Sequence, residues 1–288
     1  MTSPAMSATE IASEVERSPG SSAVALRPRV RRSVLGRITV TRWRLIALAG
    51  FVLLWHLASI PAGRLLLPSP VDIFPALIDE LRSGQLVTAT LVSLQVFVAG
   101  YALAVVTGVG LGVLMGGMPR LGETLEIYVN AVNATPRIAL IPLFILWFGL
   151  GPVAKIAVVW FMAVLPVVIN TYAGVQNTDP DLLEAARSFG ARRGQLFRHV
   201  MLPGALPYVV TGLRLGASMA MIGTVFAELQ TALAGLGYLM AQFSGSFQTA
   251  KYFVPVLVLA GMGMLVSQSL KVAERRLARW KQLREVSV

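Results

Sequence analysis

Four polar side chains recur at helical spacing in an otherwise apolar stretch of the sequence. Glu126, Asn130, Asn133 and Arg137 stand at positions i, i+4, i+7 and i+11, which predicts that they share one face of a single helix. Such a stripe would offer amides and a cation to an anionic solute. The same residues would also suit a buried network that joins helices, for example a pair of Glu126 with Arg137. The residues alone leave both interpretations open.

Further polar residues fall inside apolar segments later in the chain. Asn170 and Tyr172 add hydrogen-bonding groups, and Arg214 stands eleven residues after Pro203, about 16 Å along a helix. Glu228 lies near the far end of the same segment, where a gate or rim residue is expected. Charged side chains are costly in lipid and therefore face protein or water. The candidate pathway residues are Asn133, Arg137, Asn170, Tyr172, Arg214 and Glu228.

Neither catalysis nor ATP binding is indicated by any motif. The G-x-x-x-x-G-K-[ST] phosphate loop is absent, so a different chain would have to hydrolyse ATP. His56 and His199, the two histidines, fall in separate segments without a partnered nucleophile. The lack of cysteine removes disulfides and thiolate metal ligands. We expect no catalytic residue and no metal site. The net charge of +11 comes without a folded basic domain, so it does not indicate nucleic-acid binding.

The elements that carry these residues are apolar segments of membrane-spanning length. Hydrophobic residues make up 55% of the chain and charged residues only 14%, and a helix needs about 20 apolar residues to cross the hydrocarbon core. The first segment is short and the third contains Pro136 and Pro142, so one of these two is expected to be broken or re-entrant. The sequence predicts an all-α polytopic membrane protein with about six spans, at 45–60, 94–115, 125–148, 153–175, 205–229 and 253–272.

Small residues recur every four positions in two of the predicted spans. They are Gly100, Ala104, Gly108, Gly112 and Gly116 in the second span, and Gly212, Gly216 and Ala220 in the fifth. In lipid, such seams let helix backbones approach closely. A seam between two subunits and packing within one subunit are both compatible with the pattern, and we favour packing within the subunit.

Basic residues mark one side of the membrane. Lys and Arg cluster before residue 45, at Arg120, in 187–198 and in 271–284, and six spans would place all of these on one side. By the positive-inside rule, that side is cytoplasmic and holds both termini. The predicted domains are a disordered basic tail (1–42), a transmembrane domain (43–272) and a basic C-terminal tail (273–288).

The loop 177–203, between the fourth and fifth spans, contains residues that typically begin and end helices. Asp179 is a good N-cap and Pro180 a good first helical residue, whereas Gly190 favours the left-handed conformation that ends a helix. A second short helix is expected to follow and to end at Pro203. The apolar face of the first helix would suit either a lipid surface or the groove of another protein, and its residues do not decide between them.

This loop resembles the EAA---G---------I-LP signature of ABC-importer permeases. The residues that match it at every fixed spacing, with Val in place of Ile, are Glu184, Ala185, Ala186, Gly190, Val200, Leu202 and Pro203. The resemblance covers about residues 45–280. Five further segments are similar to the branch that imports nitrate, sulfonates and taurine, with relatives that handle pyrimidines: 67–70 (LPSP), 139–149 (ALIPLFILWFG), 170–174 (NTYAG), 206–215 (LPYVVTGLRL) and 235–239 (GLGYL). The Arg-rich N-terminal tail and the segment 231–234 (TALA) depart from that pattern.

The resemblance implies a type I ABC-importer permease fold, in the plasma membrane of a prokaryote. In that family the motif forms a coupling helix that inserts into a nucleotide-binding subunit. The ATPase-coupling residues would then be Glu184, Ala185, Ala186, Phe189, Gly190, Leu202 and Pro203. The partner ATPase would bind ATP and Mg²⁺, and this chain would bind no cofactor. A second permease subunit, expected to be identical, and an extracytoplasmic solute-binding protein would complete the importer.

Two other functions remain open at this point. An ion-driven secondary transporter would place carboxylates in mid-membrane and show repeated halves, whereas this sequence offers few deep acids and no evident repeat. A membrane scaffold could also use loop 177–203 to recruit a soluble protein. Co-purification with an ATPase would separate the importer from both. The solute is not indicated by these residues beyond a sulfonate, taurine, nitrate or a similar small molecule.

Overall fold

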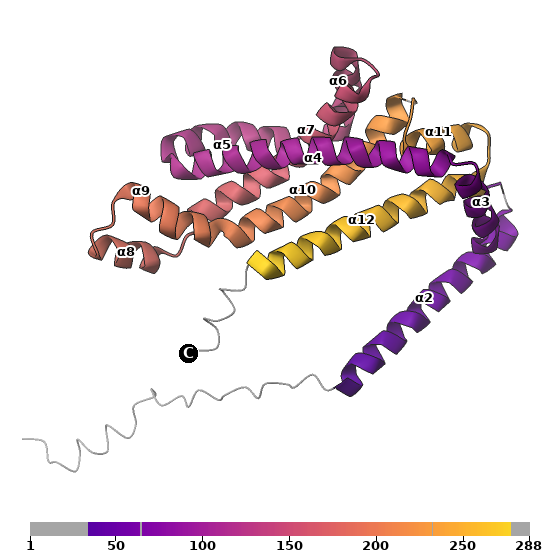
Figure 1. The fold of residues 1–288 in the computed structure, drawn as a ribbon, viewed down its shortest axis with the longest axis horizontal. Coiled ribbons are helices and arrows are strands. Elements are labelled where there is room, and N and C mark those ends of the chain that lie inside the picture. The colour runs from indigo at the N-terminus through magenta and orange to yellow at the C-terminus, as the bar shows by residue number, and fades with distance from the viewer. Residues whose placement is uncertain (1–33, 64, 232, 278–288) are drawn as a thin grey trace, which may run out of the picture. The chain divides into compact units, whose positions relative to one another are not determined.

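The computed structural model describes residues 34–63, 65–231 and 233–277, and within these residues every regular element is a helix. The chain divides into two units between Phe51 and Val52, and all the sites below belong to the second. The elements are α2 (Val34–Ala62), α3 (Pro70–Arg82), α4 (Gln85–Gly117), α5 (Pro119–Ala134), η1 (Arg137–Leu140), α6 (Ile141–Phe148), α7 (Pro152–Gln176), α8 (Pro180–Ser188), α9 (Arg193–Leu196), η2 (Phe197–Met201), α10 (Leu202–Thr231), α11 (Leu236–Gly245) and α12 (Thr249–Leu277) (Figure 1).

Five of the described helices are long and apolar enough to cross a membrane, and the described residues hold six spans if the bent pair of α5 with η1–α6 is counted as one. The predicted all-α membrane fold is therefore confirmed. Helix α2 begins at Val34 and α12 ends at Leu277. The apolar stretches of spanning length within them are Arg42–Ala62 and Thr249–Val272. The rest of the two predicted tails lies outside the described residues.

The third span is the broken one, with an angle of 87° between its halves. Helix α5 ends at Ala134, and Thr135 is extended at φ −75° and ψ 138°. Pro136 explains the break, because the ring of a proline disfavours helical conformation in the residue before it and its nitrogen donates no hydrogen bond. The stripe predicted from Glu126 to Arg137 is therefore wrong as a single helical face, since Arg137 lies beyond the bend.

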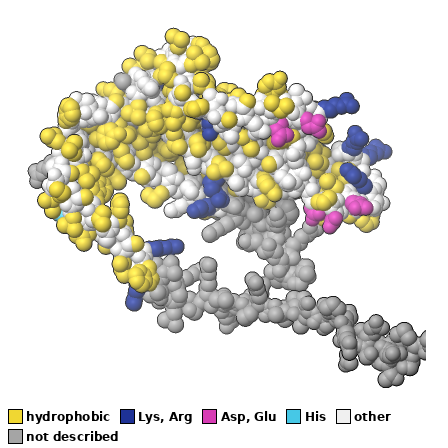
Figure 2. Space-filling view, turned by 180° about the vertical axis from the view of Figure 1, so that it is seen from behind, with side chains coloured by type: hydrophobic (Ala, Val, Ile, Leu, Met, Phe, Trp, Pro, Cys, Tyr) yellow, Lys and Arg dark blue, Asp and Glu magenta, His cyan; other side chains and the backbone are white. Residues whose placement is uncertain are grey.

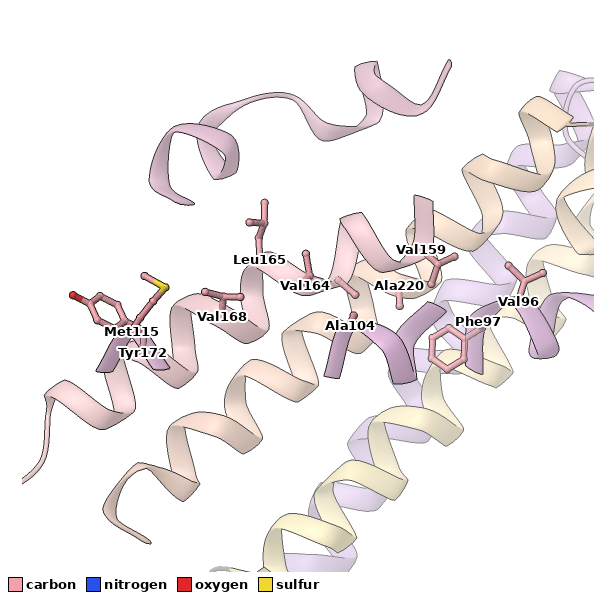
Figure 3. Packing of buried hydrophobic residues seen from close by; sticks show 11 residues of the cluster. Val96, Phe97, Ala104, Met115, Val159, Val164, Leu165, Val168, Tyr172 and Ala220 are labelled. Carbon is pink, nitrogen blue, oxygen red and sulfur yellow. The ribbon is translucent and has the colours of Figure 1, made fainter. Parts of the chain in front are cut away.

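Helix α7 packs between α4 and α10, and the small-residue seams make this possible. A Cβ added at Gly112 of α4 would lie 2.6 Å from Thr171 of α7, and one added at Gly216 of α10 would lie 2.7 Å from Val167 of α7. The seams therefore pack within the subunit, as favoured. Figure 3 shows side chains of the three helices converging in this core, where Ala104 and Ala220 are fully buried.

A second core joins α3, α4, α11 and α12. Helix α11 was not predicted, because the segment 230–252 reads as a loop between spans. Its residues Leu236, Leu239 and Phe243 are buried in this core. The core is tied by a 3.1 Å ion pair between Glu80 of α3 and Lys251 of α12.

Candidate functional site

Helix α8, in loop 177–203, is capped at both ends by residues close to it in sequence. Asp179 accepts a hydrogen bond from the N–H of Asp181 at 3.0 Å, and Pro180 is the first helical residue. At the other end, Gly190 has φ +76°, and its N–H donates to the carbonyl of Arg187 at 2.8 Å. A left-handed glycine with this bond is the common way to close a helix. The predicted caps of this helix are confirmed.

No residue of α8 is buried by the rest of the described chain. Glu184 and Ala185 are exposed and Ala186 is half-buried. Phe189, which follows the helix, is 92% exposed, and Leu182 is 38% exposed. The ring of Phe189 is thus left uncovered by the described chain at the end of a helix that is capped at both ends.

Charged side chains of both signs gather around α8 and α9, on the face seen in Figure 2, while most of the remaining described surface there is hydrophobic. This contrast fits a helix pair outside the membrane, attached to spans inside it. The exposed charged residues of the loop are Asp179, Asp181, Glu184, Arg187, Arg192, Arg193 and Arg198.

The second helix of the loop does not end at Pro203, contrary to expectation. Helix α9 passes through the π-helical turn η2 directly into α10. In that turn the N–H of Leu202 donates to the carbonyl of Phe197, five residues back. A wider turn rearranges the hydrogen-bond ladder and so accommodates a proline that lacks an N–H. From α9 onward, loop 177–203 therefore continues into the fifth span as one helical run, whereas α8 is joined to α9 by the turn at Gly190. Leu202 and Pro203 are the first residues of α10.

A cavity of about 140 Å³ with several polar lining residues lies between the middle of α5 and the last turns of α7. Tyr172 of α7 is buried; its hydroxyl donates to Glu126 of α5 at 3.1 Å and accepts from Gln176. Asn130 also lines the cavity. Asn133, one turn further along α5, is exposed. The structure thus joins Tyr172 to the stripe residue Glu126, a pairing that the sequence did not predict.

Arg137 is held by helix α7 rather than by Glu126. Its Nη1 donates to the carbonyl of Met162 at 2.9 Å, and its Nη2 lies 4.0 Å from the sulfur of Met219. The carbonyl of Met162 would normally accept from the residue four positions later, which is Pro166 and has no N–H. Arg137 therefore satisfies a carbonyl that a proline has left without its helical partner.

Asn170 and Arg214 lie apart from this group. The side chain of Asn170 donates to the carbonyl of Pro166 at 2.8 Å, within α7. A Cβ at Gly212 would lie 2.8 Å from that of Asn170, so the asparagine stands at the contact with α10. Arg214 is half-buried and lines a cavity of about 40 Å³ between α10 and α12. The six candidate pathway residues are therefore not brought together in one site within the described chain.

Glu228, at the far end of α10, is fully buried. The hydroxyl of Ser93 in α4 donates to its carboxylate at 2.8 Å, and the N–H of Gly237 in α11 donates to the same group at 2.9 Å. Lys155 of α7 is 4% exposed and donates to the carbonyl of Ala234 at 2.8 Å. Ser93 and Lys155 were missed from the sequence, although a lysine inside an apolar span is a usable signal of a built polar site.

A family model matches residues 108–280, more than half of the chain, and describes a binding-protein-dependent transport system inner membrane component. The chain belongs to this family. The permease is accordingly a multi-pass membrane subunit of an ABC transporter, and its family works with a partner ATPase and a binding protein. This sets aside the secondary transporter and the scaffold.

The permease also resembles characterised relatives along most of their length. It is 32% identical over 233 residues to a taurine transport system permease protein of Escherichia coli (strain K12), covering 78% of this chain and 84% of that protein. It is 32% identical over 232 residues to a formylaminopyrimidine transport permease protein of Halalkalibacterium halodurans, covering 80% and 92%.

A solved structure has the same fold. The permease matches a chain of the methionine ABC transporter MetNI in an inward facing conformation with a TM-score of 0.55 and 21% identity, over 69% of this chain and 98% of that chain. The expected fold of a type I ABC-importer permease is therefore confirmed.

Proposed function

We propose that the permease forms the membrane path of an ATP-driven importer for a small anionic solute and takes its driving force at loop 177–203. The observation that carries the proposal is α8 itself, a capped helix with an almost fully exposed Phe189 and no buried residue. A short helix with one exposed aromatic anchor suits a groove in a soluble partner, here the ATPase.

The charge of α8 favours a protein partner over a lipid surface. With its N-cap, the helix exposes Asp179, Asp181 and Glu184 against a single basic residue, Arg187. Helices that lie on anionic membranes carry the opposite bias, because the lipid surface attracts Lys and Arg. Arg192, Arg193 and Arg198 lie beyond α8, on the second helix of the loop, so for α8 itself the lipid-surface alternative left open by the sequence is the weaker one.

The assembly and orientation of the importer follow from the same proposal. Loop 177–203 and both termini face the cytoplasm, where the basic clusters stand. Two permease subunits, identical in the simplest case, enclose the path, and an ATPase subunit docks on each loop. An extracytoplasmic binding protein delivers solute at the opposite end. Because α9, η2 and α10 are continuous, movement of a docked loop would tilt α10 and expose the path to alternate sides.

The path itself is proposed to run along α5 and the bend that follows it. Asn133 is exposed on α5, and Arg137 is half-buried beyond the bend, where Met162 holds its guanidinium in place. An amide and an oriented cation would suit a sulfonate or nitrate oxygen. Tyr172, with Glu126, would border the cytoplasmic end of the path.

The solute is proposed to be a sulfonate, taurine, nitrate or a similar small molecule that carries an anionic group. The companion binding protein offers the most direct test: its thermal stability would be measured with taurine, alkanesulfonates, nitrate and formylaminopyrimidine. Stabilisation by a sulfonate or nitrate supports the proposal. Stabilisation by the pyrimidine alone would refute the anionic solute and leave the coupling proposal intact.

Coupling is tested by co-purification of the ATPase with permease variants. Glu184→Lys reverses a charge on α8, and Glu123→Lys makes the same change at an exposed position of α5. The proposal predicts that Glu184→Lys loses the ATPase while Glu123→Lys retains it. Equal retention by both variants, each inserted in the membrane, would contradict docking at α8.

A further inference from the structure

The turn between α10 and α11, residues 233–237, is built around the carboxylate of Glu228. Gly235 has φ +109°, and a Cβ there would lie 2.2 Å from the carboxyl carbon of Glu228. A Cβ at Gly237 would also collide, at 2.7 Å from Cβ of Glu228. The backbone of the turn therefore follows the glutamate so closely that only glycine fits at these two positions.

Donors from three elements, α4, α7 and α11, converge on Glu228 and on the turn. Ser93 of α4 donates to Glu228 and accepts from the N–H of Leu236 at 2.8 Å, so one hydroxyl links the carboxylate and the turn. Gly237 donates directly to Glu228, and Lys155 of α7 binds the carbonyl of Ala234. A buried carboxylate is tolerated only where such donors replace water. These bonds therefore hold the turn in one place.

The turn forms one wall of a cavity of about 420 Å³ at the same end of the molecule. Ala234 and Gly235 line it on one side, and Ala89 of α4 and Gln242 of α11 line it elsewhere. Ala89 is 6% exposed. Displacement of the turn would widen this cavity beside Ala89 of α4.

We propose that Glu228, Ser93 and Lys155 form a buried latch that keeps turn 233–237 closed over the outer end of the permease until ATP-driven movement of α10 releases it. The latch rests on the proposed orientation, in which this end faces away from the cytoplasm. Glu228 sits on α10 itself, 26 residues after Leu202, so tilting of α10 moves the carboxylate away from its donors. Glu228 is a positioning residue in this account and does not contact solute.

Cysteine labelling tests the latch, because the chain contains no cysteine. Ala89→Cys places a buried thiol beside the turn, and Ser244→Cys places an exposed thiol on α11 that does not line the cavity. The complex with its ATPase would be treated with a membrane-impermeant maleimide, without nucleotide. Adding Glu228→Gln removes the charge of the acceptor while keeping its shape, and is expected to raise the labelling rate at Ala89→Cys at least about tenfold, with no change at Ser244→Cys.

Further variants keep the test decisive. Ser93→Ala removes a single donor and is expected to raise the rate about threefold; if Glu228→Gln does not fold, this variant decides. A nucleotide that closes the ATPase should raise the labelling rate at Ala89→Cys when Glu228 is present. It should add little when Glu228→Gln is also present, because the latch is then already open. A residue with only a structural role would not change the response to nucleotide in this way. Unchanged labelling in both folded variants would overturn the latch. Loss of the ATPase from every complex would instead contradict the coupling proposal. In that case the labelling rates of the isolated permease, with and without Glu228→Gln, would still test the latch.

Discussion

The two ends of helix α10 are built in opposite ways. At the loop 177–203 end, α8 has no buried residue and exposes Phe189. At the other end, Glu228 and Ser93 are fully buried. Ser93 donates a hydrogen bond to Glu228 and accepts one from the N–H of Leu236 in the turn that follows. One end leaves α8 uncovered by the described chain, and the other pairs its buried polar groups within the subunit. The difference suggests that force enters at the exposed end and is resisted at the buried one.

The largest effect is expected from a methyl group at the buried end. Gly235→Ala adds backbone strain at φ +109° and a collision with Glu228, for a loss of about 4 kcal/mol. Gly84→Ala is the matched control, since Gly84 has φ +75° with open space around it. Thermal unfolding in detergent should show a large drop for Gly235→Ala and a small one for Gly84→Ala. Equal drops would mean that the turn is not packed against the carboxylate.

Between the two ends, Arg137→Ala is expected to abolish solute uptake while leaving membrane insertion and ATPase binding intact. Part of its effect on stability should be recovered by Pro166→Ala, because an alanine at that position supplies the N–H that the carbonyl of Met162 lacks. Uptake into proteoliposomes should stay absent in the double variant. Restored uptake would show that Arg137 only satisfies the carbonyl of Met162 and does not meet solute.

At the exposed end, Phe189→Ala should weaken ATPase binding about thirtyfold without changing the melting temperature, because Phe189 is 92% exposed. Phe247→Ala removes a ring that is 74% exposed between α11 and α12 and should leave ATPase affinity unchanged. The affinity of the purified permease for the ATPase would be measured by its binding to ATPase immobilised on a sensor surface. A fall in melting temperature for Phe189→Ala would place this ring in the fold rather than in an interface.

The smallest effect is expected at the C-cap of α8. Gly190→Ala forces alanine into φ +76° with no steric contact, at a cost of about 1 kcal/mol, or about fivefold in ATPase affinity. Gly194→Ala, at a glycine with open space around it and no positive φ, should bind as the parent does. The same binding assay compares them, and equal affinities would show that the exit from α8 does not need the left-handed turn.

Features of the exposed end were predictable because they are local in sequence. Asp179 and Gly190 fix the limits of α8 through hydrogen bonds to residues two or three positions away, and Pro180 suits the first helical position. The break at Pro136 follows from backbone chemistry alone. The prediction that Pro203 ends a helix was wrong, because the π-helical turn η2 lets the helix continue through this proline.

The buried end could not be predicted in the same way. Ser93 and Glu228 are separated by 135 residues, and their pairing depends on how α4 and α10 pack against α7. The bond from Arg137 to Met162 likewise spans 25 residues and crosses a bend whose direction the sequence did not reveal. Helix α11 was hidden because its ten residues are too few for a span and were placed in a loop.

The central claim is that α8 docks in the ATPase, and photo-crosslinking tests it most directly. Because the chain has no cysteine, Phe189→Cys provides a single attachment point for a benzophenone maleimide, with Phe247→Cys as the control. The account predicts a product with the combined mass of permease and ATPase from Phe189→Cys alone. An intact complex that gives no such product from Phe189→Cys, or gives it equally from both positions, would contradict the account.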